Sequence, residues 1–340
     1  SMRMSVPSRP SLRQMQPCLV ALLRHGYCFP STARCHWSAS RRHGRRQNIH
    51  GQEPAQRGPE NLRGSHQRQP ARRLLVRDGA RVLGCHDFNQ DLNTFLPNNL
   101  KSLRIRWCNV FNQPLINLPI NLRILEIDSE SFDFSLDNLP STLQSLKIIS
   151  MWFDQSINYL PKNLHSLTLE CESFNQSLND LPINLHSLTL KSESFEKSLK
   201  KLPSNLKCLS IESKKFCKKL NHLPNSIESL RIYCKLFNFP LDNLPISLKI
   251  LIIDCYNFNQ LLDHLPQSLE KLYIECGLFN QPLYNLPKSL KILDISTEQY
   301  DHPFDHLPSL THLKIKTTLY GYDCPLDNLP NSLQSLQITS

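Results

Sequence analysis

The chain has 340 residues, with 39 Lys and Arg against 29 Asp and Glu, and a formal net charge of +10. It is long enough to bury a sizeable core, and it contains no apolar run long enough to span a membrane as a helix. Residues 1–86 contain 16 Arg, no Lys and 3 acidic residues, whereas residues 87–340 contain 23 basic and 26 acidic residues. Nucleic-acid binding is therefore not expected of the larger part of the chain.

Residues 1–86 form an Arg-rich leader that holds seven of the nine Gly and has no sustained apolar period. Such a segment buries too little apolar surface to offset the entropy of ordering its backbone, so we expect disorder. Its longest apolar run, 18–23, is too short for the core of a secretory signal peptide. No acidic residue precedes Glu53, a bias that mitochondrial transit peptides share. A mitochondrial transit peptide, a disordered basic tail and a leader foreign to the repeat domain all stay open.

The remainder of the chain is built on a repeat. A Leu-Pro dipeptide recurs, with nine intervals of 21 residues between a first and a last interval of 22. Its prolines are Pro97, Pro119, Pro140, Pro161, Pro182, Pro203, Pro224, Pro245, Pro266, Pro287, Pro308 and Pro330. The first interval carries an extra residue near Val110, and no strand is expected before Phe88. We therefore place about 11 full repeats, with partial ends, in residues 87–340.

Each repeat carries apolar residues at fixed places. Counting from the proline, these are aliphatic at three, six and eight, aromatic at thirteen and leucine-like at seventeen. The spacing predicts a turn followed by one short strand, whose sixth and eighth residues point the same way. One strand per 21 residues in constant register predicts a parallel sheet of stacked coils. The fold class expected is therefore a mainly β repeat solenoid, a leucine-rich-repeat-like horseshoe in which each Pro closes a coil.

Two further repeat positions are expected to be structural. An Asn or Asp usually follows the aromatic, and we expect it to satisfy backbone groups in the turn. Ten residues after the proline stands Cys, Ser or Thr, which indicates a need for a small side chain. For Cys234, Cys255 and Cys276 we favour reduced structural thiols over metal or disulfide chemistry, because no Cys-x-x-Cys pair occurs.

No set of nucleophile, base and orienting acid stands out from the repeat background. After residue 86 only Gly277 and Gly321 occur, so a glycine-rich phosphate loop is not expected. The sequence predicts a protein that is not an enzyme, with no cofactor, no metal and no small-molecule substrate.

The exposed face of the sheet is the candidate binding surface, since residues five, seven and nine after each proline should lie on it. Its charges are mixed, which does not favour phosphate binding, and aromatic residues lie among them, as at protein interfaces. The candidate partner-binding residues are Arg104, Arg106, Glu126, Asp128, Lys147, Glu170, Lys191, Glu212, Arg231, Tyr233, Asp254, Tyr273, Glu275 and Asp294.

A second candidate is a lysine cluster on the outer coils of two adjacent repeats, which suits an acidic partner or is simply solvated. It consists of Lys197, Lys200, Lys201, Lys214, Lys215, Lys218 and Lys219.

The runs FNQPLINLPINL at Phe111–Leu122 and FNQPLYNLPKSL at Phe279–Leu290 resemble the FNIP repeat, a relative of the leucine-rich repeat. The resemblance extends over residues 87–340. It implies a protein-binding solenoid in the reducing cytoplasm and, because such repeats are often joined to an F-box, a substrate receptor of a ubiquitin ligase. Residues 1–86 show no F-box pattern.

The expected function is therefore a non-catalytic scaffold that binds a protein partner on the exposed sheet face. The alternatives are nucleic-acid or acidic-partner binding through the Arg-rich leader, and a mitochondrially targeted repeat protein.

Overall fold

The computed structural model describes residues 73–77, 79–84, 86–92 and 95–339, and for 73–77 the backbone alone. The chain divides into two compact units, Ser1–Pro70 and Ala71–Ser340. The first unit lies outside the described residues, and so does nearly all of the leader for which disorder is expected. The second unit contains the repeats.

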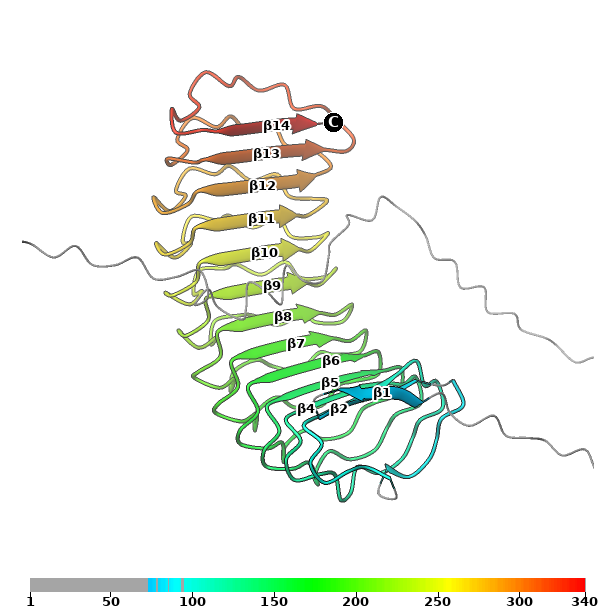
Figure 1. Cartoon of the computed structure of the whole chain (residues 1–340). Coiled ribbons are helices and arrows are strands. Elements are labelled where there is room, and N and C mark those ends of the chain that lie inside the picture. The colour runs from blue at the N-terminus through cyan, green and yellow to red at the C-terminus, as the bar shows by residue number, and fades with distance from the viewer. Residues whose placement is uncertain (1–72, 78, 85, 93–94, 340) are drawn as a thin grey trace, which may run out of the picture. The chain divides into compact units, whose positions relative to one another are not determined.

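The repeat unit is a parallel β-solenoid, in which each coil contributes one strand to a single sheet (Figure 1). Neighbours in the chain are neighbours in the sheet throughout. No α-helix occurs among the described residues. The strands are β1 (Arg73–Arg77), β2 (Ala80–Gly84), β3 (Ser102–Arg106), β4 (Ile124–Asp128), β5 (Ser145–Ser150), β6 (Ser166–Cys171), β7 (Ser187–Lys191), β8 (Cys208–Glu212), β9 (Ser229–Tyr233), β10 (Ile250–Asp254), β11 (Lys271–Glu275), β12 (Ile292–Thr297), β13 (His312–Thr317) and β14 (Ser335–Thr339).

The predicted repeat register is confirmed. In β6, side chains alternate between partly exposed and buried, with Leu167 and Leu169 fully buried. These two residues pair with Leu188 and Leu190 of β7, so equivalent leucines lie behind one another. Because side chains of a strand alternate between faces, this register keeps one face buried and the other outward from β3 to β13. In β14, the last strand, Leu336 and Ile338 are exposed.

The aromatic residues of the coils stack inside the solenoid in two runs, from Phe88 to Phe216 and from Phe237 to Tyr322. Phe174 is fully buried, and its ring centroid lies 6.1 Å from that of Phe153 and 6.3 Å from that of Phe195. The rings are almost parallel, at interplanar angles of 5° and 13°. Tyr300 takes the place of Phe and stacks on Phe279 at 6.3 Å. The stacked rings therefore add contacts between neighbouring coils inside the solenoid.

Polar groups complete the coil. The carbonyl of Pro161 accepts a hydrogen bond from the amide of Leu164 at 3.0 Å, so the proline opens the tight turn that leads into the strand. The Asn that follows the aromatic residue does hydrogen-bond to a backbone group, but that group belongs to the neighbouring coil. The side-chain oxygen of Asn259 accepts a 3.0 Å hydrogen bond from the backbone amide of Asn280. Asn238 does the same for the amide of Asn259. These residues form a ladder between coils, which satisfies amides that no strand would pair.

The first coil begins earlier than residue 87, so the expectation that no strand precedes Phe88 is wrong. β2 pairs with β3 in parallel and supplies that strand, while β1 pairs with β2 in antiparallel fashion. The strand was missed because Arg81 occupies the position of the first strand leucine. Its guanidinium donates to the Phe95 carbonyl at 2.7 Å and lies over the Phe95 ring.

The extra residue of the first interval is Trp107 rather than a residue near Val110. Cys108 is fully buried at the small-residue position, so Trp107 is inserted between it and the end of β3. Trp107 adopts a φ of 56°, in the left-handed region, and 62% of its surface is exposed. The insertion thus places a large aromatic side chain outside the core.

Candidate functional site

The outward face of the sheet carries all fourteen candidate residues, each partly or well exposed on β3–β12. The structure therefore places them where the alternation of the strands predicts. Their role in binding stays a prediction.

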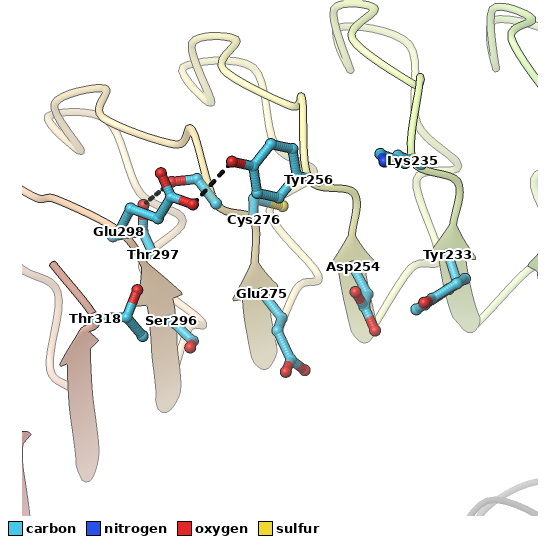
Figure 2. A pocket seen from close by; sticks show the side chains of 11 residues that line it. Tyr233, Lys235, Asp254, Tyr256, Glu275, Cys276, Ser296, Thr297, Glu298 and Thr318 are labelled. Carbon is cyan, nitrogen blue, oxygen red and sulfur yellow. Dashed lines mark hydrogen bonds between the residues drawn. The ribbon is translucent and has the colours of Figure 1, made fainter. Parts of the chain in front are cut away.

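A cavity of about 410 Å³ lies at the carboxyl ends of β9–β12, next to this face (Figure 2). One row of lining residues ends the strands, where Tyr233 pairs with Asp254 and Glu275 pairs with Ser296 in the sheet register. A second row stands two residues later in the chain, in the loops that follow the strands. That row consists of Lys235, Tyr256, Gly277, Glu298 and Thr318.

In the second row Gly277 has no side chain, and the Tyr256 side chain occupies the space next to it. The Tyr256 ring lies over Gly277, where a β-carbon would stand only 2.4 Å from a ring carbon. The Tyr256 hydroxyl then donates to a carboxylate oxygen of Glu298 at 2.8 Å, joining coils whose equivalent residues are 42 apart in the chain (Figure 2). A β-carbon at this position would collide with the ring, so glycine permits the bridge and the hydrogen bond to Glu298 holds the Tyr256 hydroxyl.

Carboxylates dominate the electrostatics of the cavity. Burial, with Glu275 on the next strand, raises the pKa of Asp254 to about 7, while Arg231 opposes the shift. The guanidinium of Arg231 lies 3.9 Å from the Asp254 carboxylate. Burial and the negative charge of Asp254 also raise the pKa of Tyr233. The cavity thus holds more negative charge than its surroundings neutralise.

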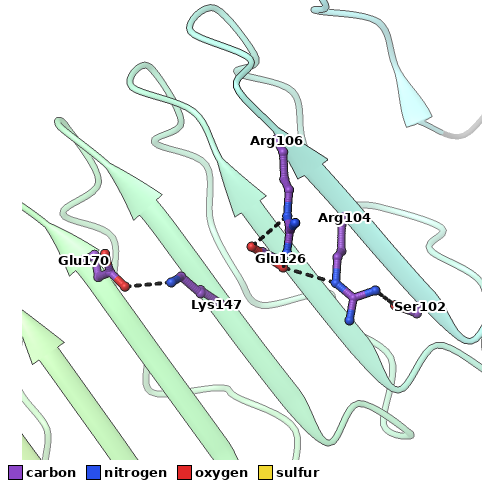
Figure 3. A network of polar contacts seen from close by, with 6 residues as sticks. All are labelled: Ser102, Arg104, Arg106, Glu126, Lys147 and Glu170. Carbon is purple, nitrogen blue, oxygen red and sulfur yellow. Dashed lines mark hydrogen bonds and ion pairs between the residues drawn. The ribbon is translucent and has the colours of Figure 1, made fainter. Parts of the chain in front are cut away.

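The opposite end of the sheet is neutralised internally. Glu126 accepts two hydrogen bonds from Arg106, at 2.9 and 3.0 Å, and lies 3.2 Å from Arg104 (Figure 3). Lys147 pairs with Glu170 at 2.7 Å in the same region. The mixed charges seen in the sequence are therefore largely partners of one another, which sequence analysis did not anticipate.

Ion pairs continue along the sheet, with Lys191 and Glu212 at 2.7 Å and Lys314 and Asp294 at 3.0 Å. Glu275 has no ion-pair partner among the described residues. Asp128 on β4 likewise has none among the described residues, so the cavity differs from the rest of the face in the number of carboxylates that gather in it.

The cysteines at the small-residue position fit the structural role expected of them. Cys171, Cys255 and Cys276 are fully buried free thiols. Each lies 3.4–3.6 Å from a backbone carbonyl of the preceding strand. Burial raises the pKa of Cys171 and of Cys255 to about 12, so neither is a thiolate at neutral pH. Among described residues no group of three or more His, Cys, Asp or Glu is arranged to hold a metal ion.

Sequence analysis missed part of the site. Tyr256, Gly277 and Glu298 stand eleven residues after a proline, and only Gly277 carried a signal, being one of the two glycines after residue 86. Trp107 and Trp152, 62% and 59% exposed, follow β3 and β5 and were not singled out either.

The predicted lysine cluster lies on exposed outer coils, where Lys214 pairs with Glu193.

Within the described part of the chain no helix is long and apolar enough to cross a membrane.

Comparisons with known proteins support a repeat architecture. The FNIP repeat matches residues 237–277. YopM from Yersinia enterocolitica is 25% identical, with a TM-score of 0.55 over 72% of this chain and 52% of that one. CroV588, described as a novel circular LRR protein, is also 25% identical, with a TM-score of 0.45 over 77% of this chain and 53% of that one.

An internalin, InlF from Listeria monocytogenes, is 16% identical, with a TM-score of 0.45 over 76% of this chain and 86% of that one. The chain spans about half the length of CroV588 and YopM. No curated protein matches it by sequence.

Proposed function

Because this chain is an FNIP and leucine-rich-repeat-like repeat protein, we propose that it is a non-catalytic scaffold that binds a protein partner on the outward face of its sheet. Folds of this type offer a broad regular surface, and their families are generally non-catalytic. The fourteen outward candidate side chains of β3–β12 are partly or well exposed, so they are available for contact with a macromolecule.

The observation that carries the proposal is the surface of β9–β11. Tyr233, 43% exposed, and Tyr273 stand on this face, and Ile252 lies between Arg231 and Tyr273 in the sheet register. Carboxylates of the adjoining cavity border this apolar group. Aromatic anchors surrounded by polar residues are the arrangement found at the centres of protein interfaces.

Affinity capture from native cells tests the proposal. We expect the variant with both Tyr233→Ala and Tyr273→Ala to lose partners that the wild-type chain retains. Tyr284→Ala is the matched control, since Tyr284 is an exposed tyrosine, at 52%, outside the strands. Circular dichroism establishes that each variant is folded. Identical sets of captured proteins from wild type and the double variant contradict the proposal.

A finer proposal, based on the FNIP resemblance, is that the partner is a substrate presented to a ubiquitin ligase. It requires ligase subunits to co-purify with the intact chain independently of Tyr233 and Tyr273. Their absence from the captured material contradicts it.

A further inference from the structure

The cavity beside β9–β12 has an excess of acidic groups over basic ones. Asp254, Glu275 and Glu298 contribute carboxylates, and Lys235 is the one basic residue in its lining. Glu275 has no ion-pair partner among the described residues, and Arg231 approaches Asp254 only to 3.9 Å. Three carboxylates beside a single lysine give the cavity an excess of negative charge, which a cation from outside would neutralise.

Aromatic surface adjoins these carboxylates. The Tyr256 ring lies over Gly277 and is held by its hydrogen bond to Glu298, and Tyr233, at the end of β9, also lines the cavity. A ring fixed in advance loses little entropy on binding. Such rings suit the alkyl stem of a long basic side chain and can stack against its charged end.

The size and charge of the cavity disfavour a bare metal ion and an anion as its ligand. Its volume, about 410 Å³, falls in the range of small ligand pockets, so it exceeds what a bare ion needs. No group of three metal-ligating side chains occurs in the part of the chain that is described. Anions would meet three carboxylates.

From charge complementarity and the fixed aromatic ring, we infer that the cavity receives a Lys or Arg side chain from a basic polypeptide segment lying across β9–β12. This inference rests on the proposed function, because it names the chemistry of the protein partner. The carboxylates of Asp254 and Glu275 pair with the cation, and the rings of Tyr256 and Tyr233 cover its stem.

Libraries of immobilised synthetic peptides, each with one fixed central residue, test the inference with the full-length chain. We expect wild type to bind the libraries with central Arg or Lys at least about tenfold more tightly than those with norleucine or citrulline, the scale of one charge-assisted hydrogen bond. The variant with both Asp254→Asn and Glu275→Gln should lose this preference.

Two controls make the result specific. The variant with both Glu130→Gln and Glu172→Gln removes two exposed carboxylates from the loops that follow β4 and β6, outside the fourteen candidate residues, and it should keep the preference. Gly277→Ala should weaken it, because a β-carbon displaces the Tyr256 ring. Thermal unfolding followed by circular dichroism confirms that each variant is folded.

The outcomes separate the two proposals. Binding of apolar or acidic peptides that depends on Tyr233 and Tyr273 overturns the inference and leaves the scaffold function in place. A basic preference that survives Asp254→Asn with Glu275→Gln also overturns it. Calorimetric binding of calcium chloride alone, abolished by the same variant, would make the cavity an ion site instead. If wild type binds no peptide and captures no protein, both proposals fail.

Discussion

The carboxyl of Asp254 should make the stability of the solenoid depend on pH. Burial and Glu275 raise its pKa to about 7, compared with about 4 for an exposed aspartate. Because the folded pKa lies above the unfolded one, the folded chain binds this proton more tightly. The stabilisation is therefore complete below about pH 4 and is lost as the pH rises through about 7.

The size of the effect follows from the shift. At about 1.4 kcal/mol per pKa unit, the limit is about 4 kcal/mol. The Asp254 side chain is 21% exposed, and Arg231 opposes the shift. Water screening lowers what is realised, so we expect about 2 kcal/mol.

Asp254→Asn removes the ionisation and keeps the shape of the side chain. We expect the variant to match wild type at about pH 4 and to exceed its free energy of unfolding by about 2 kcal/mol at about pH 8. Urea unfolding followed by circular dichroism measures both values. Asp128→Asn, at the same strand position on β4, is the control. A difference between Asp254→Asn and wild type that is the same at both pH values would refute the reasoning.

Three further predictions concern the coils. Phe174→Ala should lower the free energy of unfolding by about 3–5 kcal/mol in chemical denaturation, because it empties a fully buried site between two stacked rings; a loss below about 1 kcal/mol would contradict the stack's role. Asn259→Ala should cost about 1–3 kcal/mol by the same measurement and speed hydrogen exchange at the Asn280 amide, which loses its acceptor. Unchanged exchange there would show that the side-chain ladder does not protect the amide. Arg106→Ala should cost less than about 1 kcal/mol, since its ion pair with Glu126 is partly exposed and Arg104 still reaches the same carboxylate.

The first coil shows why a repeat can be missed at its boundary. A repeat is recognised in the sequence by the leucines at its strand positions, and β2 has Arg81 at one of these positions. At the end of a stack a long basic side chain can cover the core while its charged end reaches a carbonyl, here that of Phe95. A residue that breaks the period can therefore still belong to a strand, and only the pairing of β2 with β3 reveals this.

The Asn position was understood only in part for a related reason. Its side chain was expected to satisfy backbone groups of its own turn. In the structure, Asn259 accepts from the next coil, 21 residues further along the chain. Stacking brings equivalent residues of successive coils together, so a local motif becomes a contact between coils.

The 21-residue period by itself determined the stacked coils, the strand positions and the outward placement of the candidate residues, because a single coil cannot bury its leucines without neighbours. The tertiary structure decided which outward charges neutralise each other and where a cavity forms. That cavity depends on departures from the repeat. Gly277 lacks a side chain, and the Tyr256 ring occupies the space beside it. The Tyr256 hydroxyl donates a hydrogen bond to Glu298, which lies two coils away. A period specifies what every coil has in common, whereas a binding site arises where neighbouring coils differ.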